Sequence, residues 1–100
     1  MERYNSKTFD ETGKIALHKD LQERLDLHMG DQLSLNIISS MLVFRKACPI
    51  LFNSDTLITL EESGIVQVPA YIRAELGWKD GDELTVYHVK DFIIFKLRAS

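Results

Sequence analysis

The stretch Gly64–Leu84 reads GIVQVPAYIRAELGWKDGDEL, and each part of it carries a local structural signal. Residues 66–68 read VQV, which is the period-two pattern of a short half-buried strand. Pro69 then stands where a helix can begin, because the amide hydrogen that proline lacks is not needed there. Ile72 and Leu76 are four positions apart and share one helical face, so they can anchor the helix to a core. The stretch therefore predicts a strand followed by a short helix.

The end of this predicted helix is marked by Gly77. A glycine just past the last apolar position suits a left-handed C-terminal cap, and Trp78 can then fold back onto the apolar side of the helix. Residues 80–82 read DGD and turn the chain into a further strand over residues 83–89. A last strand over 92–97 follows after a turn, which completes the order strand, helix, strand, strand.

The same stretch occurs a second time, 51 residues earlier in the chain. Sliding the sequence against itself by that distance brings Gly13 onto Gly64 and needs no gap from Thr8/Thr59 to Phe44/Phe95. Apolar positions match in the same register, so two copies of one unit make up the chain. The identical pairs are Thr8/Thr59, Glu11/Glu62, Gly13/Gly64, Leu25/Leu76, Gly30/Gly81, Asp31/Asp82, Leu33/Leu84 and Phe44/Phe95.

The repeat predicts two units of the order β-β-α-β-β, a first over residues 1–47 and a second over residues 56–100. A unit of about 50 residues is marginal alone because it buries too little surface, so the two units are expected to share one core. The linker over 48–55 contains the apolar run ILF at residues 50–52 and is expected to pack against the body. The predicted strands are 7–10, 14–17, 32–38, 41–44, 56–60, 66–68, 83–89 and 92–97, and the predicted helices are 20–27 and the one after Pro69.

The pattern GxVxVPxxIRxxLGxxxGDxL in Gly64–Leu84 resembles the core motif of the AbrB/MazE/SpoVT family of swapped-hairpin transcription factors and antitoxins. The first copy matches less fully, with His18 in place of the proline, Gln22 in place of the arginine and Asp26 in place of the glycine that ends the helix. The resemblance implies a mainly β fold with two short helices, in which two units interleave their strands into a swapped-hairpin β-barrel. With both units in one chain it implies an intramolecular pseudo-dimer. Exchange of units between two chains, and assembly into homo-dimers or higher oligomers, stay open.

The resemblance also implies a DNA-binding transcriptional regulator. In this family basic side chains commonly stand six residues before the motif glycine, one after it and nine after it. Each of these positions is basic in one unit only, as Lys7 and Lys14 in the first unit and Arg73 in the second. Further basic residues lie close by in the sequence and can add phosphate contacts. The implied contacts with double-stranded DNA are Lys7, Lys14, Lys19, Arg24, Arg73 and Lys79.

An alternative is that these six residues are ordinary solvated charges, with Arg73 paired to an acidic neighbour. The chain has 12 Lys and Arg against 15 Asp and Glu, a net charge of −3 at pH 7, and such a balance does not by itself indicate nucleic acid. The second hypothesis is therefore a protein-binding module without DNA contact, such as an antitoxin with a toxin partner. Antitoxins of this family usually capture their toxin with a long C-terminal extension, and the end of the chain at Ser100 counts against that version. A third hypothesis, a small-ligand site in a related barrel, has no polar constellation to support it.

No constellation of residues indicates an enzyme, a cofactor or a metal site. The histidines His18, His28 and His88 are scattered and match no zinc-ligand spacing, so we expect them to be structural or solvent-facing. The single cysteine, Cys48, cannot form an intrachain disulfide. No apolar run approaches the roughly 20 residues needed to cross a bilayer, and the N-terminus lacks the apolar core of a signal peptide. We therefore expect a cytoplasmic protein without membrane contact.

Overall fold

The computed structural model describes residues 2–47 and 56–98, so the predicted linker over 48–55, with Cys48, lies outside the described residues. In the described ranges the protein is mainly β with two short α-helices, as the sequence predicts. The elements in chain order are β1 (Glu2–Thr8), β2 (Lys14–Ala16), α1 (Lys19–Arg24), β3 (Gln32–Ile38), β4 (Met41–Lys46), β5 (Thr56–Thr59), the 3₁₀ turn η1 (Glu62–Gly64), β6 (Ile65–Gln67), α2 (Ala70–Leu76), β7 (Glu83–Val89) and β8 (Phe92–Leu97).

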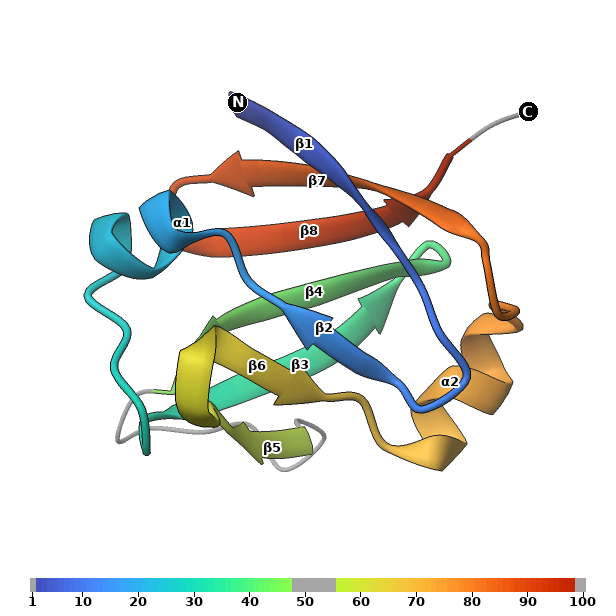
Figure 1. The fold of residues 1–100 in the computed structure, drawn as a ribbon, viewed down its shortest axis with the longest axis horizontal. Coiled ribbons are helices and arrows are strands. Elements are labelled where there is room, and N and C mark those ends of the chain that lie inside the picture. The colour runs from blue at the N-terminus through green and yellow to red at the C-terminus, as the bar shows by residue number, and fades with distance from the viewer. Residues whose placement is uncertain (1, 48–55, 99–100) are drawn as a thin grey trace.

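Six of these strands form one antiparallel sheet in the order β1-β7-β8-β4-β3-β5. The other two, β2 and β6, pair only with each other as a short antiparallel ribbon. Figure 1 shows this ribbon in front of strands of the large sheet, with α1 and α2 on opposite sides of it. The ribbon thus lies between the two helices on one face of the molecule.

Strand pairing connects the first half of the sequence with the second. At one edge of the sheet, Lys7 of β1 pairs with Leu84 of β7, and at the other edge Ile58 of β5 pairs with Leu33 of β3. Lys7 and Ile58 are 51 positions apart, and so are Leu33 and Leu84, so the two edges repeat the same pairing with the halves exchanged. In the ribbon, Ile15 pairs directly with the residue 51 positions further on, Val66. The register therefore follows the internal repeat.

The core lies between the ribbon, the two helices and the large sheet. Phe44 and Phe95, also 51 positions apart, are fully buried and meet edge to face with ring centroids 5.5 Å apart. Leu21 of α1 and Ile72 of α2 are the buried residues of their helices. Both halves of the sequence therefore contribute to one contiguous hydrophobic core.

The C-terminal ends of the two helices are built from different residues. Gly77 caps α2 in the left-handed conformation with φ of +70°, as predicted. Trp78 is buried, with its ring edge to face against Phe9 just after β1. The helix predicted over 20–27 is shorter in the structure and ends at Arg24. Asp26 turns left-handed with φ of +53°, and the amide of Leu27 donates to the carbonyl of Gln22 rather than continuing the helix.

The first strand is the largest difference from the predicted boundaries. It was expected over 7–10 but runs over Glu2–Thr8, because this segment hydrogen-bonds along β7 and forms the edge of the sheet. Phe9 leaves the strand and is buried in the core instead. The predicted strands over 32–38, 83–89 and 92–97 are confirmed with their bounds. Within the described ranges, neither helix has the length and apolar character that a membrane crossing needs.

Candidate nucleic-acid interface

The β2–β6 ribbon exposes one row of side chains and buries the other. Ile15 and Val66 face the core, whereas Lys14 and Ala16 are exposed on the outer side. Strand alternation produces this arrangement, because successive side chains point to opposite faces. The six predicted contact residues lie in two groups on either side of this ribbon.

The first basic cluster consists of Lys7, Lys19 and Arg24, which stand on β1 and α1. Lys7 and Lys19 line one groove between these two elements. Arg24 forms an ion pair of 2.5 Å with Glu2 at the start of β1. This pairing raises the pKa of Arg24 and lowers the pKa of the Glu2 carboxyl, since each charge stabilises the other. Both side chains are about half exposed, so the pair contributes little to stability.

The second basic cluster consists of Lys14, Arg73 and Lys79, which surround the turn between β1 and β2. The guanidinium of Arg73 donates a hydrogen bond to the carbonyl oxygen of Glu11 in this turn. Lys79 is brought to the same turn because the next residue, Asp80, accepts a 3.1 Å hydrogen bond from the amide of Glu11. Arg73, from the other half of the sequence, thus contacts the turn that directly precedes Lys14.

Arg73 also packs across the backbone of Gly13. A β-carbon added to Gly13 would lie 2.7 Å from Cδ of Arg73, so the arginine stem occupies the space that a side chain would need. The equivalent contact on the other side joins Gly64 and Gln22, which stand 51 positions from Gly13 and Arg73. Arg73 is thus partly engaged in holding the β1–β2 turn, and its Nε is buried without a hydrogen-bond partner among the described residues.

His18 is the residue that the sequence analysis assigned to a passive role and that the structure places in the first groove. It directly precedes α1 and lines the groove together with Lys7, Lys19 and Arg3. Burial is the main cause that lowers the pKa of His18, and the positive charge of Lys7 acts in the same direction. Arg3 was missed because the expected basic positions were counted from the motif glycine Gly13, and Arg3 stands four residues before the first of them, Lys7.

The other two histidines lie elsewhere. His28 is exposed near the carboxylates of Asp26 and Asp31, at 3.6 and 3.7 Å, as expected for a solvent-facing residue. His88 lies in β7 and its Nε2 is 2.7 Å from the carbonyl oxygen of Lys90. In residues 2–47 and 56–98, no three His, Cys, Asp or Glu side chains are grouped as metal ligands would be.

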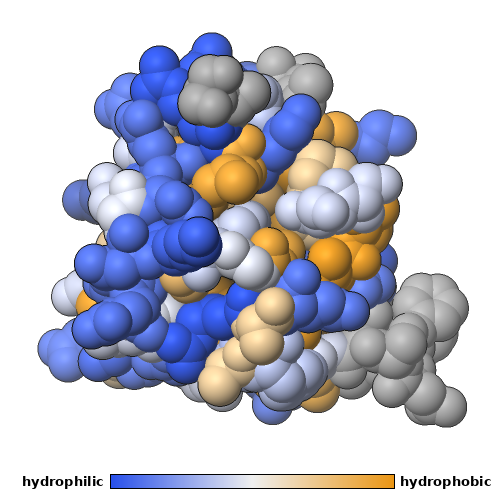
Figure 2. All heavy atoms as spheres, turned by 90° about the vertical axis from the view of Figure 1, so that its right-hand side faces the viewer, coloured by the Kyte–Doolittle hydropathy of each residue, from blue (hydrophilic) through white to orange (hydrophobic). Residues whose placement is uncertain are grey.

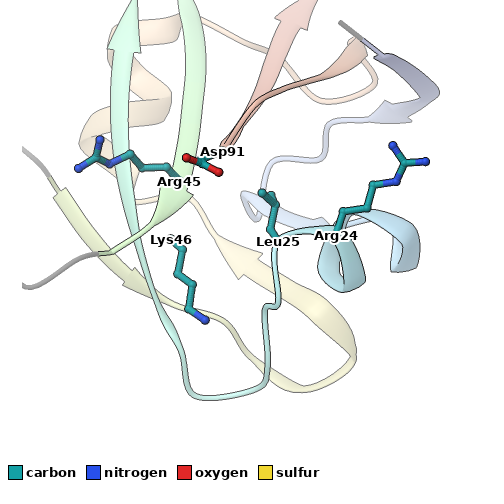
Figure 3. A pocket seen from close by; sticks show the side chains of 5 residues that line it. All are labelled: Arg24, Leu25, Arg45, Lys46 and Asp91. Carbon is teal, nitrogen blue, oxygen red and sulfur yellow. The ribbon is translucent and has the colours of Figure 1, made fainter.

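A further pocket lies between the end of α1 and the β4 and β8 strands, where Arg24, Arg45 and Lys46 line it with Leu25 and Asp91. Figure 3 shows that Arg24 and Arg45 extend in opposite directions and that Lys46 points away from both. The ammonium group of Lys46 is 2.8 Å from the carbonyl oxygen of Asp26. The basic side chains of this pocket do not converge on one ligand position.

Comparison with protein-family models, with curated proteins and with solved structures gives no match for this chain.

Proposed function

We propose that this protein is a DNA-binding transcriptional regulator of the AbrB-like type, built as two tandem β-β-α-β-β units that form an intramolecular pseudo-dimer with a swapped-hairpin β-barrel. The pairing of Lys7 with Leu84 and of Ile58 with Leu33 supports this architecture, because it repeats one register with the two halves exchanged. The direct pairing of Ile15 with Val66 supports a pseudo-twofold axis through the ribbon.

The observation that carries the DNA-binding proposal is the position of the two basic clusters on either side of the exposed β2–β6 ribbon (Figure 1). A two-stranded β-ribbon fits the major groove of B-DNA, and lysine or arginine on both sides of it can contact the phosphate backbone. Lys14, which is exposed on the ribbon itself, is the residue best placed to approach a base edge. Lys7, Lys19 and Lys79 would position the protein on the backbone.

Arg73 has a double role in this proposal. Its guanidinium donates to the carbonyl of Glu11, so it sets the shape of the β1–β2 turn that presents Lys14. A remaining guanidinium N–H group can then reach a phosphate, because arginine has five donors. Arg24 would have to exchange its ion pair with Glu2 for a phosphate contact.

The proposal is tested by fluorescence anisotropy of the purified protein with a duplex from the region upstream of its own gene, over a salt series. We expect binding that exceeds binding to a scrambled duplex and weakens steeply with salt. Replacing Lys14 by alanine should lower the affinity for this duplex more than for the scrambled duplex, as expected for a lost base contact. Replacing Lys79 by alanine should weaken binding to both duplexes and reduce the salt slope by about 0.9, the change expected for one lost phosphate contact. Lys96→Ala, at an exposed position of β8, is the matched control and should bind as the wild type does. An absence of binding at low salt would refute the proposal.

A protein-binding module, such as an antitoxin, is the second candidate function. It is favoured by apolar surface on the side of the molecule that carries α2 (Figure 2). A groove on α2, β3 and β5 is lined by Ile37, Ile72 and Tyr71, and the Tyr71 side chain is 62% exposed. Failure to bind DNA together with capture of a defined protein partner that Tyr71→Ala abolishes would favour this candidate. For either function, we propose a cytoplasmic location, which the single cysteine supports.

A further inference from the structure

The groove between β1 and the residues that lead into α1 has a volume of about 480 Å³. This volume falls within the range of about 300–1,000 Å³ that is usual for small-molecule sites. Polar and basic side chains line most of it, among them Arg3, Asn5, Lys7, His18 and Lys19. The groove is therefore large enough for a charged chemical group and is lined with hydrogen-bond donors.

Its charge is predominantly positive. Arg3, Lys7 and Lys19 face a single acidic residue of the lining, Asp20. In the part of the chain that the structure describes, none of these three basic residues forms an ion pair, whereas the neighbouring Arg24 is paired with Glu2. Three basic side chains against one carboxylate at one groove favour an anionic occupant.

His18 adds a weakly satisfied polar group to this groove. Nδ1 and Nε2 are both shielded from solvent, and the backbone of Asn5, which acts to raise the pKa of His18, makes no hydrogen bond of good geometry with either nitrogen. The ring lies against Tyr4, with centroids 5.2 Å apart. Buried polar atoms without a good partner cost stability, and an anion in the groove can supply that partner.

The other half of the chain shows that the fold does not require these side chains. Pro69 stands 51 positions after His18 with almost the same backbone, φ −58° and ψ 149° against φ −59° and ψ 140°. Lys7 and Lys19 correspond in the same way to Ile58 and Ala70. At the equivalent place the protein thus folds without the histidine and without either lysine.

We propose that this groove binds a phosphate group, with Arg3, Lys7 and Lys19 supplying positive charge and His18 donating a hydrogen bond. A phosphate suits these groups because several of its oxygen atoms can accept charge-assisted hydrogen bonds at once. The phosphate belongs either to the backbone of bound DNA or to a small phosphorylated molecule. Only the first of these sources rests on the proposed DNA-binding function.

The experiment is an NMR titration of the full chain with inorganic phosphate, against chloride and acetate at equal ionic strength. We expect saturable shifts of the His18 ring and of the Lys7 and Lys19 amides with phosphate only. The variant Lys7→Ile/Lys19→Ala should bind phosphate about tenfold more weakly or worse, since two charge-assisted hydrogen bonds are lost. His18→Pro should weaken binding as well, while Lys96→Ala should not. These groove substitutions copy the residues at the equivalent positions, so the native spectrum should be retained.

Three results would overturn the proposal. The first is an absence of saturable shifts at His18. The second is an equal response to acetate or chloride, which would remove the preference for phosphate. The third is wild-type affinity in Lys7→Ile/Lys19→Ala with a native spectrum.

Adding a short DNA duplex distinguishes the two sources of phosphate. If the duplex shifts the resonances of His18 and free phosphate competes with it, the groove holds a DNA backbone phosphate. If free phosphate binds and the duplex does not, the phosphate belongs to a small molecule, and the DNA-binding proposal fails while the groove proposal stands. If the duplex binds without moving His18 and free phosphate does not bind, the groove proposal fails while the DNA-binding proposal stands.

Discussion

Replacing Gly13 by alanine tests how closely the β1–β2 turn and α2 interlock. Gly13 has φ of +78°, and an added β-carbon would lie 2.7 Å from Cδ of Arg73 and 2.9 Å from the carbonyl oxygen of Val68. The arginine side chain can move aside. The Val68 carbonyl cannot easily do so, because the amide of the same residue donates a 2.9 Å hydrogen bond to the carbonyl of Gly13.

The expected loss in free energy of unfolding has two parts. A non-glycine residue in the left-handed region costs about 1–2 kcal/mol, and overpacking against a fixed backbone costs about 1–3 kcal/mol. Gly30→Ala is the matched control, since Gly30 also has a positive φ, +94°, but an added β-carbon would meet nothing within 4 Å. We therefore expect Gly13→Ala to be less stable than Gly30→Ala by about 1–3 kcal/mol, the overpacking part alone.

Urea denaturation of the wild type and the two variants measures this difference. Adding Arg73→Ala to Gly13→Ala should recover part of the loss and leave the part caused by Val68. In the equivalent contact, the three atoms nearest to a β-carbon added to Gly64 all belong to the Gln22 side chain, whereas a backbone carbonyl is among the nearest at Gly13. Gly64→Ala should therefore cost less than Gly13→Ala, although Gln22 must give up its hydrogen bond to the carbonyl of Leu17 when it moves. Equal stabilities for Gly13→Ala and Gly30→Ala would refute the interlock, as would a larger loss for Gly64→Ala.

Three further predictions follow from other parts of the molecule. Phe44→Ala removes a fully buried ring and should lower the free energy of unfolding by about 3–5 kcal/mol in urea denaturation. His18 should titrate in an NMR experiment below its usual pKa of about 6.5. Because the unfolded chain then binds more protons than the folded chain, the free energy of unfolding should fall as the pH falls through this range. His18→Pro should remove that pH dependence. Selection from random duplexes should yield a DNA sequence without an inverted repeat, because Lys14 and Arg73 correspond to Ile65 and Gln22 and no twofold charge pattern results.

The positions of most strands were predictable because local signals and burial agree there. Residues 32–38 and 83–89 alternate in sequence, and apolar residues of that alternation, such as Leu33 and Leu84, are buried as the pattern predicts. The polar residues next to them, Ser34 and Thr85, are buried as well, which the pattern does not predict. The strand Glu2–Thr8 was missed over most of its length because it has no apolar alternation. Its conformation is fixed by hydrogen bonds to β7, about 80 residues away in the sequence, and no local pattern reports such a partner.

The boundary of α1 shows a second limit of sequence patterns. Leu27 is apolar and buried, which favoured its inclusion in the helix. It stands two positions after Leu25, however, and so lies off the face that Leu21 and Leu25 share. Asp26 ends the helix by adopting the left-handed conformation that Gly77 adopts after α2. Aspartate tolerates this conformation better than most residues, but an aspartate in a sequence does not by itself predict it. At these equivalent positions both halves of the chain thus have a left-handed residue, but only the second half has the glycine from which the end of the helix can be predicted.

The candidate interface was predicted as a set of residues but not as an arrangement. Lys7 and Lys14 lie close in sequence, yet Lys7 lines a groove with residues next to α1, whereas the turn before Lys14 contacts Arg73. Long-range pairing decides such neighbours, so spacing alone cannot predict them. The surroundings of His18 were not predictable for a similar reason, since they come from β1 as well as from its own segment.

The comparison of equivalent positions separates residues that hold the fold from residues that serve a function. Gly13 and Gly64 keep the same left-handed turn, and Phe44 and Phe95 keep the same central contact. The groove residues differ at equivalent positions, as His18 does from Pro69, although the backbone there is almost unchanged. The requirements of packing explain why the glycine and phenylalanine pairs are the same in both halves. They do not explain why the groove residues differ. In the proposed pseudo-dimer the two halves belong to one chain, so they need not have identical surfaces as two identical chains would. Selection for binding can then act on one half alone. The side that carries Lys7, His18 and Lys19 is therefore where binding experiments should begin.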